Sequence, residues 1–390
     1  MRILIASHSY IVDLNCEKLR QLAQLQPDIE VTVIVPQRWR PGGVQNRIIE
    51  APLWQDNRFR RIPLPSVSEN NQGLLTFGWP IIPLLRHFKP HIIHVEQGAK
   101  SLGYAQLILL NKLLGLRAKH CFFTWWNLPY HNKFPINLLE TFNLRHTHGL
   151  IAGNQDGVTI LREHGYRNAA TVIPQLGVDE VLFKPEPQPE LRAELQIPAE
   201  HCVIGFVGRF VPEKGIMTLL AALALLGDRP WTLLLLGRGE LQGDIEAQAA
   251  AAGLRDRLRI VASVPHTDVP RYINAMDVLV LPSETSEQFK TLTSVGWKEQ
   301  FGHVLIEAMA CRVPVVGSDS GEIPHVIGAA GLVFPEGDAA ALSDRLATLI
   351  DSPAEREQWA ELGYQRAMER YTNLALARQQ LQFYQSLLAS

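Results

Sequence analysis

The sequence predicts an α/β fold with two domains, each built on a parallel sheet. Short apolar runs of strand length alternate with longer runs of helical periodicity, and this alternation is typical of βαβ units. The 390 residues suffice for two domains, each with its own hydrophobic core. A segment at 183–198 contains four prolines and separates two sets of alternating elements, so it is predicted to be the domain linker.

Each predicted domain has its own set of strand-like runs. In the first domain, predicted over residues 1–182, these runs are RILIAS, VTVIVP, IIHVEQ, HCFFTW, GLIAGN and TVIPQ. In the second domain, predicted over 199–373, they are CVIGFVG, WTLLLLG, LRIVAS, VLVLPS, VPVVGS and GLVF. A long helix is predicted over 374–390, at the end of the chain.

Bulk composition argues against several classes of protein. A net charge of −2 disfavours a general nucleic-acid binder. The four cysteines are scattered without CxxC spacing, so neither a disulfide framework nor a zinc site is indicated. The first apolar run is short and interrupted by His8, which predicts a strand rather than a signal peptide. No apolar stretch reaches the ~20 residues that a membrane-spanning helix needs, so the chain is expected in the cytoplasm.

Charge is divided unevenly along the chain. Residues 1–180 carry 19 Lys and Arg against 13 Asp and Glu, whereas residues 181–390 carry 18 against 26. Basic clusters lie at 38–47 and 58–61, with tryptophans nearby. We favour the interpretation that these clusters form a solvated basic face. They could instead contact an anionic acceptor, or the anionic surface on the inner side of a membrane.

A glycine-rich segment with two cations, GFVGRFVPEKG at 205–215, joins a predicted buried strand to a predicted helix. Glycines at such a turn let backbone N–H groups approach an oxyanion, and the helix N-terminus adds partial positive charge. Arg209 and Lys214 would add two full positive charges. Lys214 alone would be an ordinary surface lysine, but in this setting the segment predicts a phosphate site.

Glu299 and Glu307 are separated by seven residues in the stretch EQFGHVLIEAMA. Gly302 and the start of an apolar helix lie between them, so one carboxylate is predicted in the loop before the helix and the other in its first turns. A glutamate near a helix start is commonly a charge stabilised by the helix dipole. The pair therefore gains a functional meaning only together with the two cations.

In this order and spacing, the cation pair and the two glutamates resemble the C-terminal half of the family-4 retaining glycosyltransferases, or glycosyltransferase group 1. The resemblance continues over GRGELQGDIEAQA, DVLVLPS, VPVVGSDSGEIPHVI and GLVFPEGD, and covers most of residues 200–340. It implies the GT-B fold, in which two Rossmann-like domains face each other across a cleft and the helix at 374–390 packs back on the first domain. Ligands of such folds bind at the carboxyl ends of the strands.

The resemblance implies that the 199–373 domain binds a nucleoside diphosphate sugar, linked to UDP or GDP, and that no cofactor or metal is needed. Arg209 and Lys214 would stabilise the leaving diphosphate, as a divalent ion does in other enzymes. Glu299 would hold hydroxyls of the donor sugar and is grouped with the two cations as catalytic. Glu307 would bind the ribose. Further donor contacts are expected from Gly208, Gly237, Val264, Phe301, Gly302 and His303.

The first domain, predicted to lie on the acceptor side, departs from the family pattern. A glycine pair often follows the first strand in relatives, where this chain reads SHSYIVDLNCEKL. A histidine is frequent where FFTWWNLPYHN places Trp126 and Asn127, and a second one where IIHVEQG has Glu96. In the reaction that the family is thought to follow, the leaving phosphate can take the acceptor proton, so no protein base is obligatory. His8, Glu96, Trp126 and Asn127 are candidates for contacting the acceptor or the sugar, against structural roles in the domain.

These features predict a metal-independent retaining hexosyltransferase that uses a UDP- or GDP-sugar and a glycan or lipid-linked acceptor in envelope or exopolysaccharide synthesis. Two alternatives stay open. One is a nucleotide-sugar epimerase on the same fold, which needs no acceptor, and the other is a nucleotide-sugar-binding protein that has lost transfer. A nicotinamide oxidoreductase is disfavoured because no GxGxxG follows the first strand.

Overall fold

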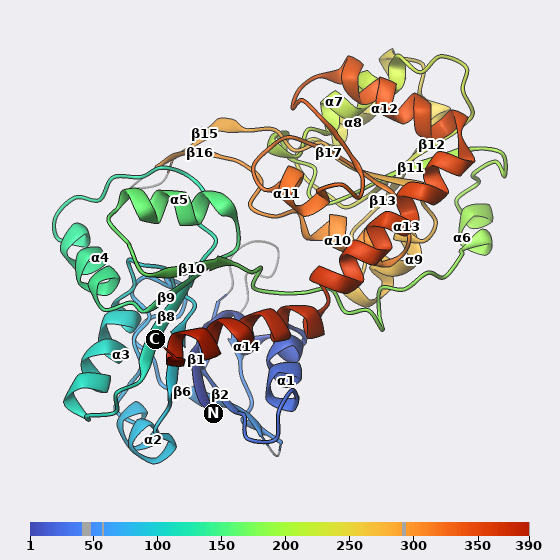
Figure 1. The fold of residues 1–390 in the computed structure, drawn as a ribbon. Coiled ribbons are helices and arrows are strands. Elements are labelled where there is room, and N and C mark those ends of the chain that lie inside the picture. Colours follow the sequence, from blue (N-terminus) through green and yellow to red (C-terminus); the bar gives the residue numbers. More distant parts are fainter. Residues whose placement is uncertain (41–47, 57, 291–293, 390) are drawn as a thin grey trace. The chain divides into compact units, whose positions relative to one another are not determined.

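The computed structural model describes residues 1–40, 48–56, 58–290 and 294–389, so most of the basic cluster at 38–47 lies outside the described residues. Contacts within the chain divide it into two compact units (Figure 1). Unit 1 comprises Met1–Gly177 together with the last helix, α14 (Asn373–Ala389), and unit 2 comprises Val178–Thr372. Both units have the predicted α/β architecture, which confirms the fold class.

Unit 1 is built on an eight-stranded sheet in the order β10-β9-β8-β7-β1-β2-β6-β5, parallel except for the edge strand β5. The strands are β1 (Arg2–Ala6), β2 (Glu30–Pro36), β5 (Trp54–Gln55), β6 (Phe59–Leu64), β7 (Ile92–Val95), β8 (Lys119–Thr124), β9 (Gly149–Ala152) and β10 (Ala169–Val172). A separate antiparallel pair is formed by β3 (Arg38–Trp39) and β4 (Ile49–Glu50). The central strands are buried on both faces, as a parallel sheet requires.

Helices cover both faces of this sheet (Figure 1). Helix α1 (Glu17–Gln24) and α14 pack together on one face. The other face is covered by α2 (Ile81–Phe88), α3 (Leu102–Leu113), α4 (Ile136–Arg145) and α5 (Gln155–Glu163). Tyr384 of α14 shares a 2.6 Å hydrogen bond with Nδ1 of the buried His94 on β7. This bond fixes the end of the chain to the sheet of unit 1.

Three of the described cations of the two basic clusters are held in ion pairs within unit 1. Arg38, Arg60 and Arg61 form ion pairs with carboxylates at 3.5, 3.7 and 2.9 Å respectively. Trp39 is buried, and the Arg61 side chain is buried beside Asp13. These contacts agree with a structural and solvated role, while contact of this region with a membrane stays a prediction.

Unit 2 is built on a six-stranded, fully parallel sheet in the order β13-β12-β11-β14-β17-β18. Its strands match all six predicted runs: β11 (Cys202–Val207), β12 (Trp231–Leu236), β13 (Leu258–Val261), β14 (Val278–Leu281), β17 (Val315–Ser318) and β18 (Leu332–Phe334). The helices are α6 (Pro189–Glu194), α7 (Ile216–Ala224), α8 (Gln242–Ala251), α9 (Val269–Ile273), α10 (His303–Ala310), α11 (Ile323–Ile327), α12 (Ala339–Asp351) and α13 (Pro353–Arg370). Helix α6 lies inside the proline-rich segment, whose role as a linker stays a prediction.

Two features do not follow from the sequence pattern. Strand β6 reads FRRIPL, and its two arginines interrupt the apolar run by which a buried strand is predicted. The antiparallel hairpin of β15 (Ser286–Lys290) and β16 (Val295–Trp297) is inserted between β14 and α10. Its mixed polar sequence carries no clear alternation of polar and apolar residues.

Among the described helices, none is both long and apolar enough to cross a bilayer.

Candidate functional site

The loop after β11 carries the two predicted phosphate-binding cations. Gly208 and Arg209 follow the strand, and a 3-10 turn, η4 (Pro212–Lys214), leads through Gly215 into α7. Gly215 has a φ of 65°, and a Cβ there would lie 1.8 Å from the carbonyl oxygen of Pro282. Only glycine fits this close approach. The loop after β11, which carries Arg209 and Lys214, therefore lies directly against the segment that follows β14.

A second close approach joins the ends of two neighbouring strands. Gly237 follows β12, and a Cβ on it would lie 1.9 Å from the carbonyl oxygen of Gly208, after β11. The Gly208 N–H donates to the carbonyl of Leu236 at 3.0 Å. Backbone thus contacts backbone at the carboxyl ends of adjacent parallel strands, the edge at which α/β folds bind their ligands. Of the other predicted donor contacts, Val264 lies in the loop that follows β13 and is partly buried.

Lys214 and Glu299 form an ion pair, with 2.5 Å between Nζ and Oε2. The same carboxylate oxygen accepts a hydrogen bond from Oγ of Ser283 at 2.8 Å. These three side chains come from η4, from the loop after β14 and from the loop before α10, so the contact ties three segments together. Both charged side chains are mostly buried, 16% and 9% exposed, where screening by solvent is weaker than at the surface. The Lys214 ammonium has three donors, so pairing with Glu299 leaves it able to bind a phosphate oxygen.

Arg209 lies outside this ion pair. Its side chain is 59% exposed, and its Nη2 lies 3.4 Å from Oε1 of the buried Glu213. A guanidinium presents a planar fork of donors that matches phosphate geometry. Arg209 is therefore exposed at the rim of the strand ends, whereas Lys214 is mostly buried, and binding of a ligand by either cation stays a prediction.

Helix α10 begins immediately after Gly302, which has a φ of 84°. Phe301 is buried, and its ring lies 5.7 Å from that of Tyr371 and 4.9 Å from that of the partly buried His303. The Phe301 ring is thus part of the core, and a ligand contact at this position would use the backbone. The partial positive charge of the helix N-terminus adds to that of the two cations.

Glu299 lies in the loop before α10, and Glu307 lies within the helix, as the sequence predicts. Glu307 retains some exposed surface, yet burial raises the pKa of its carboxyl to about 7. Among the described residues, no charge or hydrogen bond lowers the pKa of Glu307 in compensation. A carboxyl with a raised pKa and no compensating partner is a candidate for binding a ligand that supplies hydrogen bonds.

Trp297 is a candidate that the sequence pattern does not identify. It ends β16, and Lys214 Nζ lies 5.0 Å from the centroid of its ring. The ring is partly exposed and covers the ammonium beside Glu299. Its position only two residues before Glu299 was the available signal, but the hairpin that turns the ring toward Lys214 could not be foreseen.

Two of the candidates in unit 1, His8 and Glu96, follow neighbouring strands. His8 comes after β1, its ring lies 4.8 Å from that of Trp39, and burial lowers its pKa to about 4, so it is neutral at pH 7. Glu96 follows β7 and is buried, and burial raises its pKa. Its two oxygens accept hydrogen bonds from the Tyr10 hydroxyl at 2.8 Å and from the Gln175 amide at 2.7 Å. Glu96 is thus engaged inside the unit, and its contact with a sugar stays a prediction.

Trp126 and Asn127 follow β8. Asn127 is buried, and Trp126 is partly buried, with its indole N–H donating to the carbonyl of Leu128 at 2.5 Å. Lys100 Nζ lies 4.6 Å from the centroid of the Trp126 ring and 3.7 Å from that of Tyr130. These rings are therefore partly covered by a cation of the same unit. The structure brings Lys214 and Glu299 into contact, whereas the four unit 1 candidates belong to a separately folded unit.

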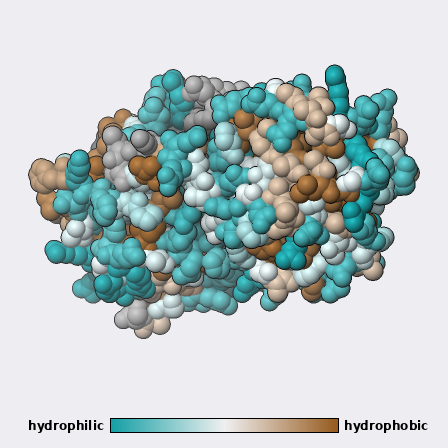
Figure 2. Space-filling view, turned by 90° about the horizontal axis from the view of Figure 1, so that it is seen from above, coloured by the Kyte–Doolittle hydropathy of each residue, from teal (hydrophilic) through white to brown (hydrophobic). Residues whose placement is uncertain are grey.

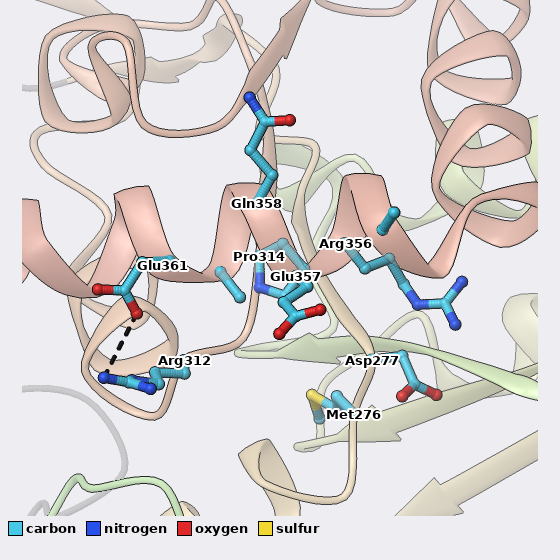
Figure 3. Close-up of a pocket in the computed structure, with 10 residues that line it drawn as sticks. Met276, Asp277, Arg312, Pro314, Arg356, Glu357, Gln358 and Glu361 are labelled. Carbon is cyan, nitrogen blue, oxygen red and sulfur yellow. Dashed lines mark ion pairs between the residues drawn. The ribbon is translucent and has the colours of Figure 1, made fainter.

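A cavity of about 730 Å³ lies elsewhere in unit 2 (Figure 3). It is lined by Asp277 and Pro314, which precede β14 and β17, and thus lies at the amino ends of the strands. Three of its charged side chains form ion pairs: Arg312 with Glu361 at 3.3 Å, and Asp277 with the neighbouring Arg192 at 2.9 Å. The cavity does not include any predicted donor-binding residue.

Within the described ranges, no three His, Cys, Asp or Glu side chains are grouped as a metal site requires.

Comparison with known proteins gives several matches. The curated relatives include a 2-deoxystreptamine glucosyltransferase from Streptomyces kanamyceticus, 29% identical over 227 residues, which are 56% of this chain and 55% of that protein. A 2-deoxystreptamine N-acetyl-D-glucosaminyltransferase from Streptomyces fradiae is 28% identical over 321 residues, 73% of this chain and 70% of that protein. The chain thus spans about half the length of the first relative. Among solved structures, HepE from Anabaena in complex with UDP and glucose has a TM-score of 0.67 at 20% identity, covering 99% of this chain and 100% of that one, which shows a shared fold.

Two family models match the two units. The model for glycosyl transferases group 1 matches residues 187–366, and the glycosyl transferase 4-like domain matches residues 18–175. Both describe glycosyltransferases and together they account for most of the sequence. The chain therefore belongs to the group 1 glycosyltransferases of family 4, with the GT-B fold.

Proposed function

We propose that this chain transfers a hexose from a UDP- or GDP-sugar to a glycan or lipid-linked acceptor, with retention at the anomeric carbon and without a metal ion. The observation that carries the proposal is the Lys214–Glu299 ion pair beside Arg209 at the carboxyl ends of the unit 2 strands. This is the edge at which an α/β fold binds a nucleotide. Two cations with the N-terminus of α10 form a binding site suited to a diphosphate.

In the proposed reaction, an acceptor hydroxyl oxygen forms a bond to the anomeric carbon while the bond from that carbon to the diphosphate oxygen breaks. Both events occur on the same face of the sugar, and the acceptor proton moves to the leaving phosphate oxygen. Arg209 and Lys214 stabilise the negative charge that develops on the diphosphate. Glu299 holds Lys214 in position and binds sugar hydroxyls, and Glu307 binds the ribose.

Names of similar proteins support the donor class. HepE, which shares the fold, is described in complex with UDP and glucose, and two relatives are named as a glucosyltransferase and an N-acetyl-D-glucosaminyltransferase. A hexose linked to a nucleoside diphosphate is consistent with all three. We place the acceptor in envelope or exopolysaccharide synthesis and the enzyme in the cytoplasm or on the inner face of the membrane, both from the resemblance of the sequence to its family.

The phosphate-binding role of the cations is tested by Arg209→Ala and by the double variant Lys214→Ala/Glu299→Gln. The double variant avoids leaving the buried Glu299 carboxylate without its counter-charge. We expect each cation to contribute about 1.5–3 kcal/mol to binding of a nucleoside diphosphate, the range for hydrogen bonds to charged groups. Calorimetry measures the affinity, with the exposed Arg271→Ala of the same unit as the control. Unchanged affinity in both site variants would place the donor site elsewhere.

The role of Glu307 predicts a pH dependence of donor binding. Only the ionised carboxylate accepts hydrogen bonds from both ribose hydroxyls, and its pKa of about 7 means that it is mostly protonated at pH 6. Affinity for the nucleotide sugar should rise about tenfold from pH 6 to pH 8. The esterified diphosphate of the donor does not titrate in this range. Glu307→Gln should bind with the same affinity at both pH values. A wild-type affinity that is equally flat would contradict the ribose contact.

Metal independence and retention are tested together by running transfer in excess chelator and identifying the product anomer by proton NMR. We expect full activity in chelator and a product with the anomeric configuration of the donor, because Arg209, Lys214 and the α10 N-terminus stabilise the leaving group. Loss of activity that magnesium or manganese restores, or an inverted product, would refute this part of the proposal. Conversion of the donor to a second sugar nucleotide without acceptor would identify the epimerase alternative instead.

A further inference from the structure

The β15–β16 hairpin brings an aromatic ring back to the candidate donor site. The chain leaves β14 at its carboxyl end, forms the two antiparallel strands and returns to the loop that carries Glu299 before α10 begins. Trp297 is the last residue of β16 and lies opposite Ser286, the first residue of β15. The backbone pairing therefore fixes Trp297 at the base of the hairpin, two residues before Glu299.

Trp297 differs from the other large apolar side chains described in the hairpin. Phe289 is 44% exposed and Val295 is 57% exposed, whereas Trp297 is partly buried. Figure 2, which views the molecule from the side on which Figure 1 draws the hairpin, shows hydrophobic surface in brown among hydrophilic side chains in teal. Of these three side chains, Trp297 is the one that meets Lys214.

The Lys214 ammonium has two partners on the segment that leads into α10. Its Nζ lies 5.0 Å from the centroid of the Trp297 ring and 2.5 Å from Oε2 of Glu299. A cation within about 6 Å of an aromatic ring is attracted by the quadrupole of that ring, and tryptophan attracts it more strongly than tyrosine or phenylalanine does. The ring and the carboxylate therefore both hold the ammonium.

A neutral ring is a suitable second partner for a cation that has to bind a diphosphate. A second carboxylate would also hold the ammonium, but it would repel the anionic ligand. The ring carries no net charge, so it attracts Lys214 without opposing the negative charge of the diphosphate. The long stem of a lysine loses rotational freedom when it is held in one place. A contact that holds it before the ligand arrives removes this cost from binding.

We propose that Trp297 is a positioning residue of the donor site: its ring holds the Lys214 ammonium beside Glu299, so that the ammonium is in place when the diphosphate binds. The inference rests on the proposed function, because it concerns a cation that stabilises the leaving group. Trp297 acts through Lys214, and no contact of the ring with the ligand is required. The effect of Trp297 should therefore depend on the ammonium and on the electrostatic character of the ring.

The test compares Trp297→Leu and Trp297→Phe in the full chain, with UDP and GDP as the probes in calorimetry. Leucine is apolar but has no ring, so Trp297→Leu should weaken binding of the nucleoside diphosphate by about fivefold to thirtyfold, the range for a partly desolvated cation–π contact. Trp297→Phe keeps a weaker ring and should lose less. The matched control is Phe289→Leu, which removes an exposed ring from the same hairpin and should bind like the wild type.

The substitution Trp297→Leu is then repeated in the Lys214→Ala/Glu299→Gln variant, which lacks the ammonium. A positioning role predicts no further loss of affinity there, because the ring has no cation to hold. A ring that stacked directly on the nucleotide, or that only stabilised the fold, would give the same loss in both backgrounds. Circular dichroism and thermal unfolding show whether each variant is folded.

Equal loss in both backgrounds would overturn the inference, as would wild-type affinity in Trp297→Leu. A loss in Trp297→Phe or in Phe289→Leu as large as that in Trp297→Leu would overturn it too. The donor site itself would survive these results if Lys214→Ala/Glu299→Gln binds the probe more weakly than the wild type does. Unchanged affinity in Lys214→Ala/Glu299→Gln would instead contradict the proposed donor site, and the inference would fall with it.

Discussion

The ion pair between Lys214 and Glu299 is the interaction on which the candidate donor site depends. It joins the turn before α7, the loop after β14 and the loop before α10, three segments far apart in the sequence. Because the pair is mostly buried, removal of one partner would leave a charge that is not compensated, at a cost of about 3–5 kcal/mol. The strand ends are therefore held in place before any ligand arrives, which is the preorganisation that stabilisation of a leaving group requires.

Backbone packing imposes the second constraint on the site. The close approaches of Gly215 to Pro282 and of Gly237 to Gly208 leave no room for a side chain. They bring the loops after β11, β12 and β14 against one another, so the cations extend from a compact rim. Trp297 then covers one side of Lys214 with an aromatic ring. Partial exclusion of water around an ammonium strengthens its interaction with an incoming phosphate.

The strands of unit 2 and the location of its cations could be predicted, because the strands of a buried parallel sheet are continuous apolar runs, here followed by glycine. The contact between Lys214 and Glu299 could not be predicted, because the sequence does not show which loops lie against each other in the fold. The pattern also fails at β6, where Arg61 is buried only because Asp13 neutralises it. In unit 1, Glu96 looks like an exposed strand-end carboxylate in the sequence, yet Tyr10 and Gln175 bind both its oxygens inside the unit. The outer side of α3 resembles a core helix, and only the structure shows that its leucines are exposed.

A crystal structure of the chain with its nucleotide sugar bound would show which residues hold the donor. We expect the diphosphate to lie within hydrogen-bonding distance of Arg209 and Lys214, with the ribose on Glu307 and the sugar beside Glu299. Lys214 should bridge the Glu299 carboxylate and a phosphate oxygen, which would show that the ion pair is part of the bound state. A nucleotide in the cavity at the amino ends of the unit 2 strands, or one bound without contact to either cation, would contradict the account.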